Sequence, residues 1–156
     1  MPGDTLSMTS WGQAVATILL VEDEEQVRVL AESLLQAAGH ATLSAGSTEQ
    51  ALALLAADQH VDLLFVDLGL RADAEAGLSL ASKAIEMRPD LKVLYTSGQG
   101  ITDGMMALFV PNSAYLPKPY TVEQLGTMLS MKFGLPSSTV PNDSKDYFGN
   151  NLRPGA

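Results

Sequence analysis

The chain has 156 residues, no cysteine and a formal net charge of −9, from 9 Lys and Arg against 18 Asp and Glu. This length predicts one domain, the lack of cysteine excludes disulfides, Cys-ligated zinc and thiol nucleophiles, and the acidic balance argues against nucleic acid and membrane as partners. Hydrophobic residues make up 46% of the chain, which is enough for a packed core, and no apolar run is long enough to cross a bilayer.

The two ends of the chain differ in composition from the part between them. Residues 1–16 hold neither the Lys and Arg nor the long apolar stretch that a secretory signal needs, so we expect a flexible leader and a cytoplasmic location. Residues 135–156 are rich in Pro, Gly, Ser and Asn and show no apolar period, which predicts a flexible polar tail without an output domain. Residues 17–134 between them are predicted to form the folded domain.

In chain order, the first predicted strand is Thr17–Val21, a continuous apolar run of the kind found in parallel strands that are covered on both faces. A helix over Glu25–Ala38 follows, because its apolar residues recur every three or four positions and Gly39 can cap its end. A short strand over Ala41–Ala45 comes next. Ser47 then starts a second helix with a capping-box pattern.

The middle of the chain repeats this alternation. Val61–Leu68 is a nearly continuous apolar run and is predicted to be the third strand. After a loop that contains Gly and charged residues, a helix is predicted over Gly77–Met87, because Pro89 stops it. Lys92–Thr96 is the fourth predicted strand.

The last elements are a helix over Thr102–Phe109, a strand over Ala114–Leu116, and a helix that Thr121 opens and Gly134 ends. Five strands that alternate with five helices predict an α/β fold, with a parallel sheet and helices on both faces. Ligand sites in such folds lie beyond the carboxyl ends of the strands.

The predicted strand ends carry polar side chains that such a site would bring together. They are Glu22 and Asp23, Asp67, Thr96 and Ser97, and Lys118 followed by Pro119. Three carboxylates close together repel one another unless a cation lies among them. Hard oxygen ligands suit Mg²⁺, and Mn²⁺ would also fit.

Other chemistries are disfavoured by the loops. The loop after the first strand is acidic (VEDEE), so it would repel the phosphates of a dinucleotide or a flavin nucleotide, and no Walker A or Gly-x-Ser-x-Gly motif is present. The two histidines, His40 and His60, lie near loop ends at the opposite edge of the predicted sheet, and we expect both to face solvent.

Four motifs resemble the receiver domain of response regulators, the phospho-acceptor part of two-component signalling. They are ILLVEDE at 18–24, LLFVDL at 63–68, VLYTSG at 93–98 and YLPKPY at 115–120. The spacings from Asp23 to Asp67 and from Thr96 to Lys118 are also typical of that family. The resemblance implies a flavodoxin-like, doubly wound sheet of five parallel strands in the order 2-1-3-4-5, with five helices.

The resemblance also implies a role for each matching residue. Asp67 would accept a phosphoryl group from a phosphohistidine on a histidine kinase or a histidine phosphotransfer protein. Thr96 would donate a hydrogen bond to that group, Lys118 would contact one of its oxygens, and Tyr115 would be the aromatic switch residue. The metal ligands would be Glu22, Asp23, Asp67 and the carbonyl of Gly69, and the bond before Pro119 would be cis. The chain would catalyse only its own phosphorylation and dephosphorylation, and it would relay the phosphoryl group or switch a surface that binds a downstream protein.

Some positions depart from the family pattern. Arg71 stands where a proline is usual, and Gly77 comes two residues later than the usual glycine, so the loop 69–76 is longer by two residues. Gly69 and Gly98 leave the approach to the phosphoryl group open, which predicts a short-lived phosphoaspartate. One alternative is a receiver-like module that binds partners without phosphorylation. Dimerisation through the last two helices is common in the family, and the sequence does not decide whether this chain forms a homodimer.

Overall fold

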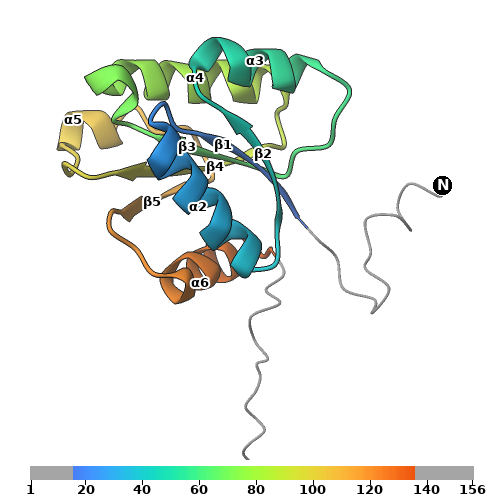
Figure 1. Cartoon of the computed structure of the whole chain (residues 1–156). Coiled ribbons are helices and arrows are strands. Elements are labelled where there is room, and N and C mark those ends of the chain that lie inside the picture. The colour runs from blue at the N-terminus through green and yellow to red at the C-terminus, as the bar shows by residue number, and fades with distance from the viewer. Residues whose placement is uncertain (1–15, 136–156) are drawn as a thin grey trace, which may run out of the picture.

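The computed structural model describes residues 16–135 as a parallel sheet between two layers of helices (Figure 1). The elements are β1 (Thr17–Val21), α2 (Glu25–Ala37), β2 (Ala41–Ala45), α3 (Thr48–Ala56), β3 (Leu63–Asp67), the 3-10 turn η1 (Leu70–Ala72), α4 (Ala74–Met87), β4 (Lys92–Ser97), α5 (Asp103–Met106), β5 (Ser113–Pro117) and α6 (Val122–Phe133). None of the helices in this part of the chain is long and apolar enough to span a lipid bilayer.

The five strands are all parallel and lie in the order β2-β1-β3-β4-β5, which confirms the predicted fold class and strand order. The order reverses direction between β1 and β3, so their carboxyl ends flank the crevice in which ligands of such folds bind. In the register of the sheet, Asp67 at the end of β3 lies directly beside Thr96 of β4.

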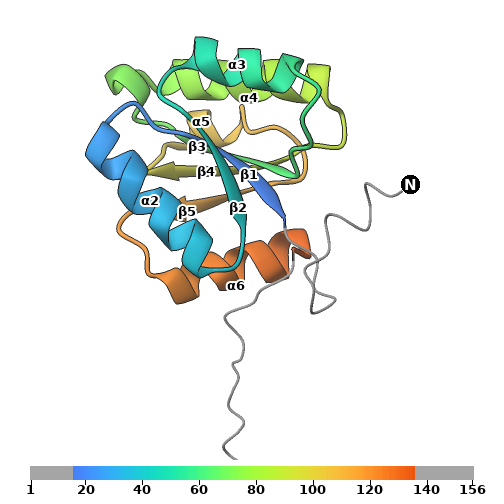
Figure 2. The same cartoon turned by 45° about the vertical axis from the view of Figure 1, so that its right-hand side comes forward.

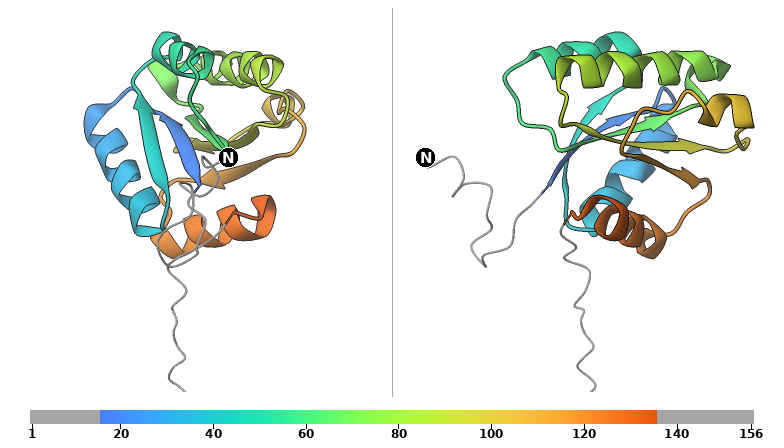
Figure 3. Two further views of the ribbon diagram at one scale, coloured as in Figure 1. Left: turned by 90° about the vertical axis from the view of Figure 1, so that its right-hand side faces the viewer. Right: turned by 180° about the vertical axis from the view of Figure 1, so that it is seen from behind.

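Helices cover both faces of the sheet, and each face has its own core. Figures 2 and 3 show α3 and α4 on one side and α2 and α6 on the other. Alternate residues of β3 point into the two layers: Leu64 and Val66 pack on the side of α3 and α4, and Leu63 and Phe65 on the side of α2 and α6. All four are fully buried. Burying a side chain of this size contributes about 1.5–3 kcal/mol, so β3 is held firmly from both sides.

The residues that flank the predicted domain lie in this core. Ala16 and Leu135, which flank the predicted range 17–134, are both buried in the layer formed by α2 and α6. Apart from these two residues, the predicted leader and tail lie outside the residues that the structure describes.

The segment after β3 differs from the prediction. The helix predicted over 77–87 begins at Ala74, and the preceding residues form η1, with Leu70 buried. Ala72 takes a left-handed conformation with φ of 56°. Asp73 then caps α4 by accepting a hydrogen bond from the backbone of Glu75. The loop predicted at 69–76 is therefore mostly regular structure.

The helix predicted over 102–109 was too long, because α5 covers only Asp103–Met106. Three residues after the end of this helix, Phe109 stacks on Tyr95, with ring centroids 4.0 Å apart. The Tyr95 hydroxyl also accepts a buried hydrogen bond from the backbone of Val110. These contacts hold residues 109–110 against β4, and the helix ends before them.

The capping boxes predicted at the starts of α6 and α3 can be compared with the hydrogen bonds of the structure. Thr121 and Gln124 form the predicted capping box of α6, and Gly134 ends that helix in a left-handed conformation. At α3 the box is incomplete, because Ser47 accepts from the backbone of Gln50, but the Gln50 side chain accepts from Gly46 instead of Ser47.

The expectation for His40 was wrong. His60 does face solvent, with a side chain that is 74% exposed, but His40 is only 4% exposed. Gly39 turns the chain with φ of 98°, and the backbone of His40 then bonds to the carbonyl of Leu35 at the end of α2. This turn places the imidazole ring inside the fold.

Candidate functional site

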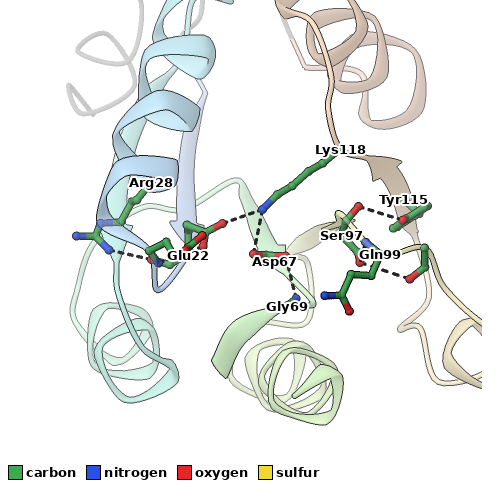
Figure 4. A network of polar contacts seen from close by, with 10 residues as sticks. Glu22, Arg28, Asp67, Gly69, Ser97, Gln99, Tyr115 and Lys118 are labelled. Atoms are coloured by element: carbon green, nitrogen blue, oxygen red, sulfur yellow. Dashed lines mark hydrogen bonds and ion pairs between the residues drawn. The ribbon is translucent and has the colours of Figure 1, made fainter. Parts of the chain in front are cut away.

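The polar residues predicted at the strand ends meet at the carboxyl edge of the sheet (Figure 4). Asp67 is the last residue of β3 and is 6% exposed, and Glu22, which directly follows β1, is 3% exposed. Lys118 follows β5 and reaches back across the edge. The ends of β1, β3 and β5 thus place two buried carboxylates and one ammonium in a single site.

Lys118 joins the two buried carboxylates. Its Nζ donates to Glu22 Oε1 at 3.0 Å and to Asp67 Oδ2 at 3.1 Å. Its backbone N–H donates to the carbonyl of Ser97 at 3.0 Å, and the peptide bond from Lys118 to Pro119 is cis. The backbone of the lysine is therefore fixed to the end of β4, and its side chain points at the acceptor predicted by the resemblance.

The loop after β3 contacts the second oxygen of Asp67. The backbone N–H of Gly69 donates to Asp67 Oδ1 at 2.8 Å. The carbonyl of Gly69, predicted as a metal ligand, accepts from the N–H of Ala72 at 2.9 Å in the 3-10 turn. A carbonyl oxygen has two lone pairs, so this bond leaves one for a further partner.

The electrostatics of the site favour an added positive charge. Burial, and then the hydrogen bond with Asp67, raise the pKa of Glu22 to about 7. Burial would lower the pKa of Lys118, but its hydrogen bonds to Glu22 and Asp67 outweigh burial and raise that pKa above its usual value. The single ammonium therefore does not fully compensate the buried carboxylates.

The donor set fits a divalent metal ion. Carboxylate oxygens of Glu22, Asp23 and Asp67 lie within 4.8 Å of one another. Mg²⁺ prefers hard oxygen ligands and is commonly held by one or two carboxylates, with water or phosphate oxygens completing its shell. A dication would also favour the charged form of Glu22, whose pKa is raised mainly by burial.

The Thr96 hydroxyl is buried beside Asp67 and has no hydrogen-bond partner among the residues that the structure describes. A buried hydroxyl without a partner is unfavourable, so such groups in folded proteins usually have a reason. An oxygen-rich group attached to Asp67 would provide an acceptor for it.

Tyr115 is half-buried on β5, and its hydroxyl donates a long hydrogen bond of 3.4 Å to the carbonyl of Ser97. The same carbonyl accepts from the backbone of Lys118, so Ser97 connects the predicted switch residue to the lysine. This role of Ser97 could not be predicted from the sequence, because a backbone acceptor leaves no pattern in side chains. Arg28, which donates to the carbonyl of Glu22 at 2.9 Å, was missed for the same reason.

The comparison with known families agrees with this geometry. The sequence pattern of the response regulator receiver domain matches residues 18–130. The chain belongs to this family. It is thus a receiver domain of two-component signalling, the kind of domain that interacts with histidine kinases and downstream effectors and generally binds Mg²⁺ at an acidic pocket.

Several relatives illustrate the range of proteins in which this domain occurs. The chain is 29% identical to the phosphate regulon transcriptional regulatory protein PhoB of Pseudomonas aeruginosa over 83% of its own length and 55% of PhoB. It is 32% identical to the sensor kinase CckA of Brucella abortus over 72% of its length, but that match spans 12% of CckA. The chain thus spans about half or less of these relatives.

A solved structure shows the same fold. The response regulator receiver protein of Sinorhizobium medicae superimposes with a TM-score of 0.68 and 29% identity, covering 77% of this chain and 95% of that one.

Proposed function

We propose that this chain is a phospho-acceptor that takes a phosphoryl group onto Asp67 from a phosphohistidine of a histidine kinase or a histidine phosphotransfer protein. The observation that supports it best is the buried Thr96 hydroxyl, which lies beside Asp67 in the sheet and has no partner in the part of the chain that the structure describes. It is a donor placed where the oxygens of an attached phosphoryl group would be. We also propose that this takes place in the cytoplasm, where phosphohistidine donors are made from ATP.

In this proposal Asp67 is the nucleophile. A carboxylate oxygen forms the new bond to phosphorus as the P–N bond to the donor histidine breaks, and the histidine nitrogen keeps the electron pair and takes up a proton. The transition state of phosphoryl transfer is loose, so positioning and charge compensation supply most of the catalysis. The hydrogen bond from Gly69 holds Asp67 in place for the attack.

Two other side chains act on the transferred group. Lys118 already contacts Asp67 at 3.1 Å, so its ammonium is placed to offset charge on a phosphoryl oxygen. Thr96 donates to another oxygen while the group is being transferred and after it is attached. Glu22, Asp23, Asp67 and the carbonyl of Gly69 would hold Mg²⁺ or Mn²⁺, which supplies additional positive charge for the phosphoryl oxygens when bound.

Phosphorylation then changes what the surface binds, or the group passes on to another protein. A phosphoryl group brings close to two negative charges and new acceptor oxygens. Movement of Thr96 toward it would open space beside β4, and Tyr115 would turn inward from its bond to Ser97. The downstream protein would read this change on α5, β5 and α6, the elements around Tyr115.

The proposal is tested by labelling the chain with acetyl phosphate in the presence of Mg²⁺. Wild type should gain one phosphoryl group that survives rapid gel filtration but is labile to base, and Asp67→Asn should gain none. Asp73→Asn is the matched control, because Asp73 lies outside the site and asparagine can cap α4 equally well. Equal labelling of the Asp67 variant and wild type would refute the proposal. Absence of labelling in folded wild type would instead support a module that works without phosphorylation.

A further inference from the structure

The side of the site formed by the loops after β3 and β4 is open to solvent, because Gly69 and Gly98 are both exposed there. An added Cβ at Gly69 would lie 3.3 Å from Asp67 Oδ1, and one at Gly98 would lie 3.9 Å from Cδ of Lys118. A larger residue at either position would therefore stand against the acceptor or the lysine. Because both are glycine, a water molecule can approach a group attached to Asp67 from this side.

Gln99 lies on this open side. Its backbone N–H donates to the hydroxyl of Ser97 at 3.1 Å, which ties the loop to the end of β4, and Ser97 itself is 5% exposed. The Gln99 side chain is exposed, and Figure 4 shows it extending toward the side of the site where Gly69 and Asp67 lie. Among the described residues its carboxamide has no hydrogen-bond partner, so both its donor and its acceptor are available.

We propose that the Gln99 carboxamide positions the water that hydrolyses the phosphoryl group on Asp67, an inference that rests on the proposed function. The amide oxygen accepts a hydrogen bond from the water, and the amide nitrogen donates to a phosphoryl oxygen. Glutamine orients the attacking water in the same way in GTP hydrolysis. Lys118 and Thr96 are already assigned to the phosphoryl oxygens, which leaves the open side for the water.

The step balances without another reactant. The water oxygen forms a bond to phosphorus, and the bond from phosphorus to the Asp67 carboxylate oxygen breaks. Asp67 leaves with the electron pair as a carboxylate, and the proton lost by the water ends on the released inorganic phosphate. Gln99 gains and loses no proton, so its contribution is orientation alone.

The test compares two rates in the full chain with Mg²⁺ present: phosphorylation by acetyl phosphate, and decay of the phosphoryl group after excess acetyl phosphate is removed. In Gln99→Ala we expect the half-life to lengthen about tenfold, the effect of one oriented hydrogen bond. The phosphorylation rate and the KM for acetyl phosphate should change less than twofold. Gln59 is the matched control, because it is an exposed glutamine that precedes β3, at the edge of the sheet opposite the site. Gln59→Ala should change neither the phosphorylation rate nor the half-life.

The outcomes separate this inference from the function on which it rests. Wild type that cannot be labelled would refute both. Normal labelling with an unchanged half-life in Gln99→Ala would refute only the role of Gln99, as would an equal slowing of both rates, which indicates a structural effect. A wild-type half-life of many hours would also overturn it, because no water would then be positioned effectively.

Discussion

Replacing Thr96 with valine should make the unphosphorylated protein more stable while impairing its function. The two side chains have nearly the same shape and the same β-branching, so strand preference and packing change little. What changes is a hydroxyl that is buried without a partner beside Asp67. Thr96→Val thus isolates the free-energy cost of keeping that hydroxyl in the fold.

The magnitude follows from the environment of the group. Thr96 is 4% exposed, so its hydroxyl loses its hydrogen bonds to water on folding and gains none from residues 16–135. Leaving a buried hydroxyl unsatisfied costs about 1–3 kcal/mol. Thr96→Val should therefore raise the free energy of unfolding by about 2 kcal/mol, which corresponds to roughly 6 °C in Tm for a domain of this size.

Urea unfolding followed by circular dichroism measures this change, and Thr121→Val provides the opposite control. The Thr121 hydroxyl accepts a hydrogen bond from the backbone of Gln124 as the cap of α6, so its loss should destabilise by about 1 kcal/mol. The same chemical change is thus expected to have opposite signs at the two sites. If Thr96→Val were as destabilising as Thr121→Val, the hydroxyl would be well satisfied in the unphosphorylated state, and the reasoning would fail.

The second measurement is phosphoryl uptake from acetyl phosphate. A hydrogen bond to a charged oxygen contributes about 1.5–3 kcal/mol, so its removal should slow phosphorylation of Asp67 by about tenfold to a hundredfold. Uptake by Thr96→Val at the wild-type rate would refute a hydrogen bond from the Thr96 hydroxyl to the phosphoryl group during transfer.

Three further predictions concern packing, helix capping and pH. An added Cβ at Gly77 would lie 3.1, 3.3 and 3.4 Å from three atoms at or just beyond the end of β3. Gly77→Ala should therefore be destabilising, because crowding of about 1–3 kcal/mol should outweigh a helix-propensity gain of about 1 kcal/mol. Gly104→Ala, where the added Cβ would meet only Thr102 Oγ1 at an unstrained 3.8 Å, should not be destabilised, and equal stability of the two variants in thermal unfolding would contradict the crowding. The guanidinium of Arg88 donates to two carbonyls at the end of α3 at 2.9–3.1 Å, so Arg88→Met should lower the free energy of unfolding by about 2 kcal/mol, whereas the exposed Lys83→Met on the same helix should change it by less than about 0.5 kcal/mol. Burial lowers the pKa of His40 below its ordinary 6.5, so its neutral form stabilises the fold above pH 6.5, and this contribution is lost as the pH falls from 6.5 through the folded-state pKa. His40→Leu should flatten this part of the plot of unfolding free energy against pH. The free energies are measured by urea titration at each pH, and a plot with the same slope as wild type would count against the prediction.

The strands and the acidic site could be predicted from the sequence because local patterns determine them. Buried parallel strands are nearly continuous apolar runs, and the bounds expected for β1 and β2 agree with the structure. Once the alternation of strands and helices indicates a parallel sheet, the strand ends must share one edge. Glu22, Asp67 and Lys118 could therefore be brought together before any contact was known.

The remaining features depend on contacts between residues distant in sequence. The helix predicted to reach Phe109 ends early because Phe109 stacks on Tyr95, and the Tyr95 hydroxyl binds the backbone of Val110, fifteen residues away. His40 is buried by a turn that depends on the end of α2. Periodicity within one segment contains no information about such partners. The helix was therefore predicted too long, and His40 was predicted to be exposed.

The segment 69–76, which the family resemblance predicts to be two residues longer than usual, lies beside the site with its two ends fixed. Gly69 donates to Asp67 and Leu70 is buried in the core, while Asp73 caps α4. The residues of this segment form η1 and the first turn of α4, and Asp67 is in contact with Lys118. Under the proposed function, an extension here would change the rim that a phosphohistidine donor passes to reach Asp67. Shortening it should affect the choice of donor protein more than labelling by acetyl phosphate, which is small enough to enter from any side.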